Sequence, residues 1–161
     1  MAKKKKKEKK QKKSMKAASA GAKAGKKKKK GAGSKKGAKA SDHKIRGLAR
    51  RIVELTTANA EDLSELYADD VESIEMNMPA MVGLDAIRKK LEGWNDMVSD
   101  PSFTAANVWV DGNNVIIEWI GDVTLKATGK RAQLREIAIH EIKNGKIARE
   151  RYYYDPAALQ P

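Results

Sequence analysis

The chain of 161 residues contains no cysteine, which excludes disulfides and thiol catalysis and fits a reducing compartment. No apolar run approaches the roughly 18 residues of a membrane-spanning helix. The basic start is not followed by the apolar stretch of a secretory signal, and residues 1–40 contain no arginine and no large apolar face, which argues against a mitochondrial presequence. We therefore expect a cytoplasmic protein without a transmembrane segment.

Charge is distributed very unevenly along the chain. Residues 1–40 contain 19 lysines and one acidic residue, Glu8, for a net charge of +18. Residues 41–161 contain 15 lysines and arginines against 20 aspartates and glutamates, for a net charge of −5, and the two parts give the +13 of the whole chain. The basic character therefore belongs to the N-terminal segment, while the remainder is mildly acidic.

The N-terminal segment has almost no large apolar side chains, so it cannot bury enough surface to offset its ordering entropy, and we expect residues 1–40 to be disordered. Its lysine, alanine, glycine and serine content resembles the tails of linker histones and bacterial histone-like proteins. Two five-lysine runs are candidate nucleic-acid contacts: Lys3, Lys4, Lys5, Lys6, Lys7, Lys26, Lys27, Lys28, Lys29 and Lys30. The segment could bind DNA or RNA phosphates without sequence preference, which would associate the protein with the nucleoid. Solubilising the protein and contacting an anionic membrane surface are the alternatives.

Residues 41–161 predict a single α+β domain with helices ahead of strands. We expect a first helix capped by Ser41, a second from Asn59 to Asp69-Asp70, and a third from about Asp85 to Asp100-Pro101. The predicted strands are Val71–Met76, Phe103–Val110, Val115–Lys126, with a bulge at Gly121, and the two halves of Gln133–Asp155. An antiparallel sheet should then bury one face against the three helices.

The strongest local signal is the turn in Gln133–Asp155. Two β-prone runs are joined by Lys143-Asn144-Gly145-Lys146, and Asn-Gly supplies the positive φ angles of a tight hairpin. Because side chains alternate between the faces of a strand, this hairpin also determines which of its residues share a face.

Five short segments occur in the order of a known superfamily. They are Leu66-Tyr67-Ala68-Asp69-Asp70, Gly83-Leu84-Asp85-Ala86-Ile87, Val110-Asp111-Gly112-Asn113 with Glu118-Trp119, Asn144-Gly145-Lys146-Ile147, and Arg151-Tyr152-Tyr153-Tyr154-Asp155. This arrangement resembles the nuclear-transport-factor-2-like superfamily, specifically its SnoaL-like members, over roughly Ile45–Ala158. The resemblance implies a conical α+β domain whose helices and curved sheet enclose a mostly apolar pocket, often in a homodimer.

Ketosteroid isomerases of this superfamily need a carboxylate base and an oxyanion pair of tyrosine and protonated aspartate. The resemblance, aligned without gaps from Tyr-Ala-Asp-Asp, places Glu75 at the base and Arg51 at the oxyanion tyrosine. With one deletion at the Asn-Gly turn, Ala138 stands at the oxyanion aspartate. SnoaL-type cyclases and related epoxide hydrolases have a catalytic aspartate where this chain has Tyr152. The resemblance therefore implies a binding domain, or an enzyme with a different acid–base set.

The pocket-facing positions implied by the resemblance provide the candidate site. If Ala138 and Tyr152 face the pocket, strand alternation turns Glu136, His140 and Glu150 inward as well. His140 is a candidate general base near neutral pH, or a sheet histidine hydrogen-bonded to a neighbour. Glu75 is a candidate base or ligand anchor, or the partner of Arg51 in an ion pair. The candidate ligand-binding residues are Arg51, Tyr67, Trp94, Trp119, Glu136 and Tyr152, although each aromatic could simply be core.

The opposite face of the hairpin carries Ile137, Ile139, Arg151 and Tyr153, which suggests a covered surface such as a homodimer interface. Two histidines without cysteine or ligand-spaced carboxylates predict no metal site, and we expect no cofactor. Two functions remain open. One is a pocket for a small apolar or polycyclic molecule, with acid–base chemistry by Glu75 and His140. The other is a non-enzymatic dimerisation module whose basic tails bind nucleic acid.

Overall fold

The computed structural model describes residues 33–160, with side chains from residue 42 onward. In chain order the elements are α1 (Gly33–Thr57), the 3-10 turn η1 (Ser64–Leu66), β1 (Tyr67–Glu75), β2 (Met81–Val82), α2 (Leu84–Met97), β3 (Val98–Asp111), β4 (Asn114–Leu125), β5 (Arg131–Lys143), β6 (Lys146–Tyr154) and the 3-10 turn η2 (Pro156–Leu159). The two lysine runs lie outside the described residues.

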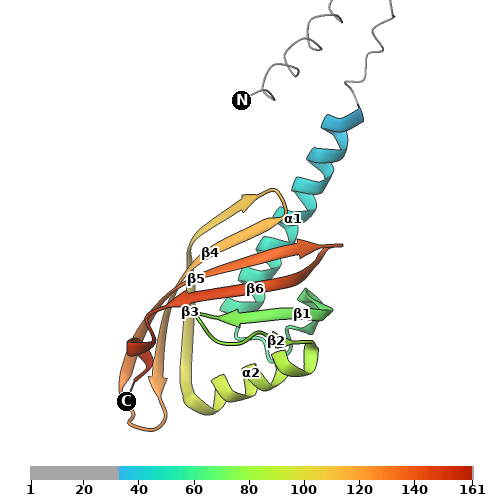
Figure 1. Cartoon of the computed structure of the whole chain (residues 1–161). Helices are drawn as coiled ribbons and strands as arrows, with labels where there is room; N and C mark the ends of the chain where they lie inside the picture. Colours follow the sequence, from blue (N-terminus) through green and yellow to red (C-terminus); the bar gives the residue numbers. More distant parts are fainter. Residues whose placement is uncertain (1–32, 161) are drawn as a thin grey trace, which may run out of the picture. The chain divides into compact units, whose positions relative to one another are not determined.

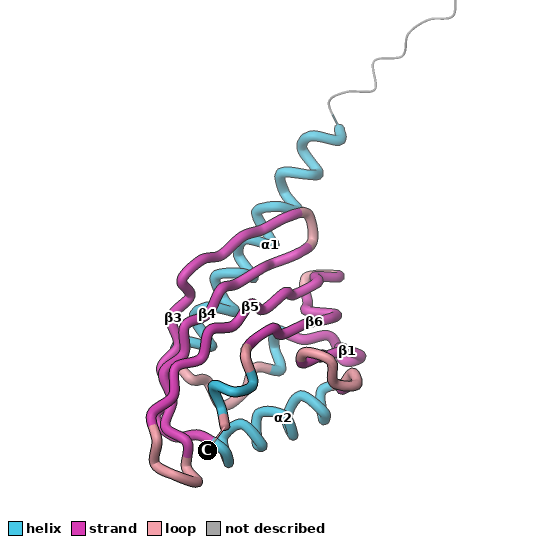
Figure 2. The backbone as a smooth tube through the Cα atoms, turned by 60° about the vertical axis from the view of Figure 1, so that its left-hand side comes forward, coloured by secondary structure: helices cyan, strands magenta, loops and turns pink. Residues whose placement is uncertain are grey.

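The strands form one six-stranded sheet in the order β2-β1-β6-β5-β4-β3. Strand β1 runs parallel to β6, and every other neighbouring pair is antiparallel. The prediction of a purely antiparallel sheet was therefore wrong, and the sheet is mixed. Figure 1 shows the long strands bending together at one end, and the turned view of Figure 2 shows α2 below the strands at the same end.

One face of the sheet packs on the helices and forms the core. In β4, buried and half-buried residues alternate through all twelve positions, which is the pattern of a strand with one covered face. Val115, Ile117 and Trp119 on that face cluster with Ile45 and Ile52 of α1. The alternate residues of β4 and the helically spaced apolar residues of α1 therefore pack in the same core.

The helices differ from those expected. Helix α1 begins at Gly33, so Ser41 lies within the helix rather than capping it, and residues 33–40, expected to be disordered, are part of α1. The second helix is only the 3-10 turn η1, and Tyr67 begins β1 instead. The domain thus has two α-helices where three were expected.

The third predicted helix ends earlier than expected. Helix α2 ends at Met97, and Asp100-Pro101 lies inside β3 rather than at the helix terminus. The register of β3 against β4 shifts between Ser99 and Ser102, and Asp100 has a positive φ of 51°. Proline cannot donate a ladder hydrogen bond, and this irregularity at the sheet edge accommodates it.

The Asn-Gly hairpin is confirmed. Asn144 and Gly145 have φ angles of 54° and 78°, and Lys143 pairs with Lys146 across the turn. By contrast, Gly121 does not form the predicted bulge, because it pairs in register with both Phe103 and Leu134. A Cβ added to Gly121 would lie 2.5 Å from Cε1 of Phe103, so glycine here leaves the space that the phenyl ring occupies.

Within residues 33–160, none of the helices is long and apolar enough to cross a bilayer.

Candidate functional site

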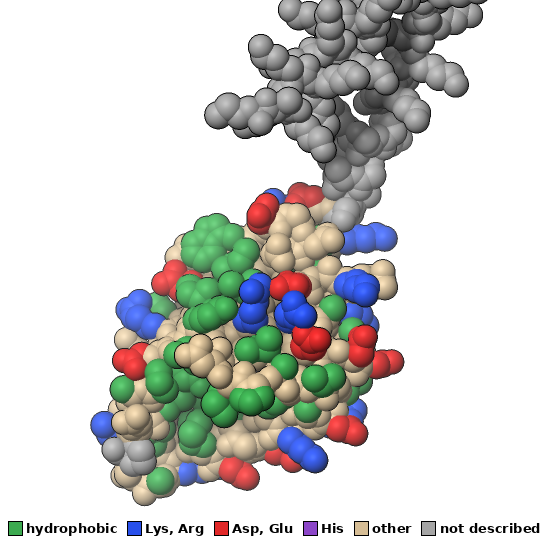
Figure 3. Space-filling view, in the orientation of Figure 1, with side chains coloured by type: hydrophobic (Ala, Val, Ile, Leu, Met, Phe, Trp, Pro, Cys, Tyr) green, Lys and Arg blue, Asp and Glu red, His purple; other side chains and the backbone are tan. Residues whose placement is uncertain are grey.

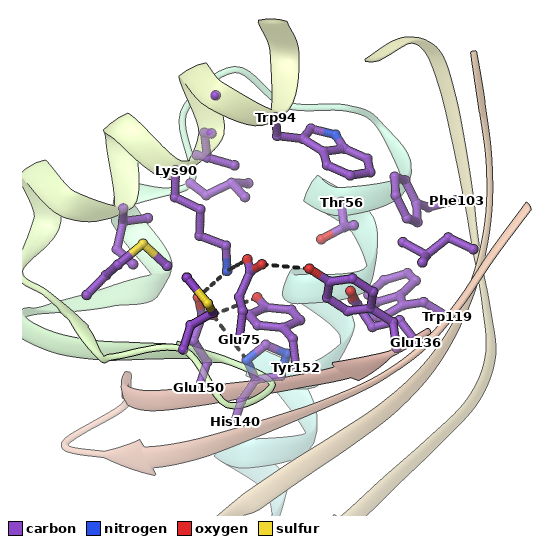
Figure 4. Close-up of a pocket in the computed structure, with 18 of the residues that line it drawn as sticks. Thr56, Glu75, Lys90, Trp94, Phe103, Trp119, Glu136, His140, Glu150 and Tyr152 are labelled. Atoms are coloured by element: carbon purple, nitrogen blue, oxygen red, sulfur yellow. Dashed lines mark hydrogen bonds and ion pairs between the residues drawn. The ribbon is translucent and has the colours of Figure 1, made fainter. Parts of the chain in front are cut away.

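A cavity of about 440 Å³ lies between the inner face of the sheet and both helices. Its volume falls in the range of about 300–1,000 Å³ that is typical of small-molecule sites. The cavity is lined mainly by apolar and aromatic side chains, with the polar groups of Glu75, Lys90, Glu136, His140 and Glu150 among them. Figure 4 shows most of these polar groups at one end and Trp94, Phe103 and Trp119 at the other.

Seven of the eight residues predicted for the pocket line this cavity: Tyr67, Glu75, Trp94, Trp119, Glu136, His140 and Tyr152. Arg51 was predicted wrongly. Its guanidinium is bound by Glu54 at 3.0 Å and Glu65 at 2.7 Å, and it does not line the cavity. On α1 the buried residue is its neighbour Ile52, so a residue one position earlier is turned about 100° away from the core.

Glu75 is held in an ion pair, but with a different partner from the one expected. Its Oε1 lies 3.0 Å from Nζ of Lys90, and its Oε2 accepts a hydrogen bond of 2.9 Å from the Tyr154 hydroxyl. Lys90 comes from α2 and Tyr154 from β6, so three elements meet at this carboxylate. Both oxygens of Glu75 are therefore occupied by protein groups.

Glu150 lies at the centre of the polar end and is completely buried. Oε2 accepts hydrogen bonds from the hydroxyls of Tyr67 at 2.9 Å and Tyr152 at 2.8 Å. Oε1 accepts from Oγ of Ser73 at 2.7 Å and from Nζ of Lys90 at 3.3 Å. A buried carboxylate is tolerated only when it is paired and hydrogen-bonded, and these four donors meet that requirement.

The same contacts determine the protonation of the network. Burial by itself raises the pKa of Glu150, but His140, Lys90 and Ser73 outweigh burial and lower it to about 2. Burial raises the pKa of the Tyr67 and Tyr152 hydroxyls well above 10, and the negative charge of Glu150 adds to this effect. At neutral pH the centre is therefore an ionised carboxylate that accepts from two protonated tyrosines.

Lys90 was not predicted and joins both carboxylates. Besides its contacts with Glu75 and Glu150, Nζ donates to Oγ of Ser73 at 3.1 Å and lies 3.7 Å from the centre of the Tyr152 ring. A signal for it exists in the sequence. Lys90 stands three residues after Ile87 and four before Trp94, so helical spacing places it on the cavity-facing side of α2.

His140 does not form the hydrogen bond that a structural histidine would have. Its side chain is 3% exposed, and neither ring nitrogen has a hydrogen-bond partner among the described residues. Its Nδ1 lies 3.6 Å from Oε2 of Glu150, and its ring meets the Tyr152 ring edge-on at 6.1 Å. A base and a sheet histidine held against Glu150 therefore both stay predictions for His140.

Glu136 differs from the other two carboxyls because it is not paired. Among residues 33–160 it makes no hydrogen bond or ion pair with a protein side chain, yet it lines the cavity. Burial raises its pKa from 4.5 to about 7; the charge of Lys90 opposes this rise, and those of Glu75 and Glu150 add to it. Glu136 can therefore exchange a proton near neutral pH, and its oxygens remain available to a ligand.

No group of three or more histidine, cysteine or acidic side chains in the described part of the chain is arranged to hold a metal ion.

With the fold and cavity established, comparison with known proteins gives the family. Residues 49–150 match the SnoaL-like domain. The chain belongs to the SnoaL-like family. A crystal structure from Mesorhizobium loti, of a proposed SnoaL-like polyketide cyclase, is 34% identical and covers 68% of this chain and 98% of its own, with a TM-score of 0.59. The predicted superfamily is thereby confirmed.

More distant SnoaL-like and related structures share the fold. A proposed SnoaL-like polyketide cyclase from Jannaschia sp. CCS1 is 15% identical, covers 74% of this chain and 90% of its own, and has a TM-score of 0.67. A proposed isomerase from Bacillus subtilis is 23% identical, covers 72% and 89%, and has a TM-score of 0.62. Together with the cavity, the family establishes a small-molecule-binding fold.

Proposed function

We propose that this SnoaL-like domain binds a small, mainly apolar molecule in the cavity and transfers a proton to or from it through Glu136. The observation that carries the proposal is an unpaired, half-buried carboxyl with a pKa of about 7 in an otherwise mostly apolar cavity. A general acid or base works best when its pKa lies near the working pH and its oxygens can reach the ligand.

This assignment moves the proton-transfer role away from the two residues that the sequence favoured. Both oxygens of Glu75 are occupied by Lys90 and Tyr154, so Glu75 would have to break an ion pair to act as a base. His140 lies next to the buried Glu150 and against the Tyr152 ring. We propose that Glu75, His140 and Lys90 instead shape the charge of the cavity around Glu136.

Deuterium incorporation into a carbon acid tests the proposal without knowledge of the natural ligand. The probe is 2-tetralone, a bicyclic ketone whose exchange from D₂O is followed by proton NMR. We expect the wild-type chain to accelerate exchange above buffer, Glu136→Gln to abolish the acceleration, and Glu118→Gln to retain it. Glu118 lies on the opposite face of the same sheet, paired with Asn107, so it is a matched control. Equal rates for wild type and Glu136→Gln, or no acceleration by the wild type, would overturn the proposal.

The outer face of the sheet favours a second candidate function, a dimerisation module. Trp109 and Tyr153 are 49% and 45% exposed there, and Ile116, Ile137 and Ile139 lie between them in register. Figure 3 shows hydrophobic side chains on the visible face, interspersed with charged ones. We propose that two copies associate through this face, because apolar side chains on neighbouring strands bury surface well.

A dimer would then carry two copies of the basic segment, residues 1–40. Two tails on one dimer raise the effective concentration of positive charge on a single nucleic acid, and counterion release makes such binding fall steeply with salt. We propose a cytoplasmic protein whose tail binds nucleic acid without sequence preference. A chain beginning at residue 33 should lose binding to duplex DNA in 50 mM salt, and retained binding would refute this role.

A further inference from the structure

The apolar end of the cavity is built from three aromatic rings set at steep angles, here called the aromatic corner (Trp94, Phe103 and Trp119). The centroids of Trp94 and Phe103 are 6.0 Å apart, with the ring planes at 47°. Those of Phe103 and Trp119 are 6.3 Å apart, at 85°. All three side chains line the cavity, and Figure 4 shows them together at one end of it.

A glycine makes the corner possible. The Phe103 ring lies over Gly121 on the neighbouring strand, where a Cβ would approach to 2.5 Å from Cε1. A side chain at position 121 would force the ring away from the sheet. The Phe103 ring thus lies between Trp94 and Trp119, in space that a side chain at position 121 would fill.

A carboxyl stands directly beside the corner. Glu136 on β5 pairs in register with Trp119 on β4, and both side chains line the cavity. Aromatic faces carry partial negative charge, so a corner of rings with an adjacent carboxylate attracts a cation. Among residues 42–160 no cation lies within ion-pair distance of Glu136, since Nζ of Lys90 is within that distance of Glu75 and Glu150 instead.

The charged groups around Glu136 also favour a cationic ligand. Facing Glu136 are Lys90 from α2, Glu75 from β1, His140 from β5, and Glu150 and Tyr154 from β6. Nζ of Lys90 lies within ion-pair distance of Glu75 and Glu150, and Nδ1 of His140 lies 3.6 Å from Oε2 of Glu150, so both basic groups among these residues are engaged with other carboxyls. A cationic ligand would supply the counter-charge that Glu136 lacks among the described side chains.

We propose that the ligand carries a substituted ammonium group, which sits in the aromatic corner with Glu136 as its counter-ion, while its apolar body fills the rest of the cavity. The inference rests on the proposed function, because it concerns the same cavity. A neighbouring ammonium favours the ionised form of Glu136, and a quaternary nitrogen, which donates no hydrogen bond, leaves the carboxylate oxygens free to accept a proton. Methylated ammonium groups suit such corners particularly well, because cation–π attraction does not require a hydrogen bond.

Two ligands of the same shape, one cationic and one neutral, test whether the cavity recognises the positive charge of an ammonium group. Choline and 3,3-dimethylbutan-1-ol have the same shape, and only choline has a quaternary nitrogen in place of the central carbon. Both are titrated into the ¹⁵N-labelled full-length protein at pH 8, where Glu136 is ionised, and dissociation constants are read from shifts of the indole N–H signals of Trp94 and Trp119. The variants are Glu136→Gln, Phe103→Leu and the outer-face control Glu118→Gln.

We expect the wild type and the control to bind choline at least about tenfold more tightly than the alcohol. Glu136→Gln should remove that preference, and Phe103→Leu should weaken choline about three- to tenfold with little change for the alcohol. Equal or tighter binding of the alcohol by the wild type, or no choline binding, would overturn the ammonium inference. Wild-type exchange of 2-tetralone in the same preparation would still support proton transfer, so the two proposals fail separately.

Discussion

Replacing Glu136 by glutamine should stabilise the protein at pH 8 relative to pH 5. Glutamine has the shape of a protonated glutamate, so at pH 5, where the half-buried carboxyl is protonated, the variant and the wild type present nearly the same neutral group. At pH 8 the wild type must keep an unpaired carboxylate in the cavity, whereas the variant has no charge to bury. The difference between the two pH values therefore isolates the cost of the ionised form.

The size of this difference in stability follows from the pKa of Glu136, which is about 7 in the folded protein and the ordinary 4.5 in an unfolded chain. A carboxyl with a raised folded pKa binds its proton more tightly when folded, so its stabilising contribution is complete below pH 4.5 and is lost as the pH rises through 7. Each pKa unit corresponds to about 1.4 kcal/mol, which gives roughly 2 to 3 kcal/mol between pH 5 and pH 8.

Urea unfolding followed by tryptophan fluorescence measures this quantity directly. Full-length wild type, Glu136→Gln and Glu118→Gln are compared at pH 5 and pH 8. The free energy of unfolding of Glu136→Gln should exceed that of the wild type by about 2 to 3 kcal/mol more at pH 8 than at pH 5. The control should show no such change. If the difference between wild type and Glu136→Gln were the same at both pH values, the raised pKa would be wrong.

Two further predictions concern residues that hold the walls of the cavity in place. Glu150→Gln should lower the free energy of unfolding at pH 7 by roughly 3 kcal/mol or more, because the fully buried carboxylate that pairs with Lys90 is lost. Glu72→Gln, at a half-buried ion pair with Arg149, should cost about 1 kcal/mol or less, and equal losses for the two variants in urea unfolding would contradict the buried network. Gly121→Ala should cost about 1–3 kcal/mol through its clash with Phe103, and less in a Phe103→Leu background. Additive costs in that double-mutant cycle would exclude the clash as the cause.

The hairpin was the part of the site most accessible from the sequence. Asn144-Gly145 fixed the turn, and strand alternation with the family resemblance then placed Glu136, His140 and Tyr152 toward the cavity. These are short-range consequences of turn chemistry and the pleat. The parallel pairing of β1 with β6 could not be obtained in the same way, because it joins segments about 80 residues apart and no local signal encodes it.

The errors on the helices have a different origin. Arg51 was placed in the pocket by an ungapped transfer from related enzymes, although the stripe formed by Ile45, Leu48 and Ile52 already turns position 51 away. Lys90 was overlooked because the apolar face of α2 was described by its apolar members alone. A lysine at the spacing of such a face indicates a buried partner, here Glu75 and Glu150, whose positions depend on the tertiary fold.

The central claim is that Glu136 exchanges a proton near neutral pH inside the cavity, and carbon NMR of its side chain tests this most directly. The carboxyl ¹³C shifts of the glutamates are followed from pH 4 to pH 9 in the full-length protein, and the signal absent from Glu136→Gln identifies Glu136. The account predicts a titration midpoint of about 7. A midpoint near 4.5, as for an exposed glutamate, would contradict it.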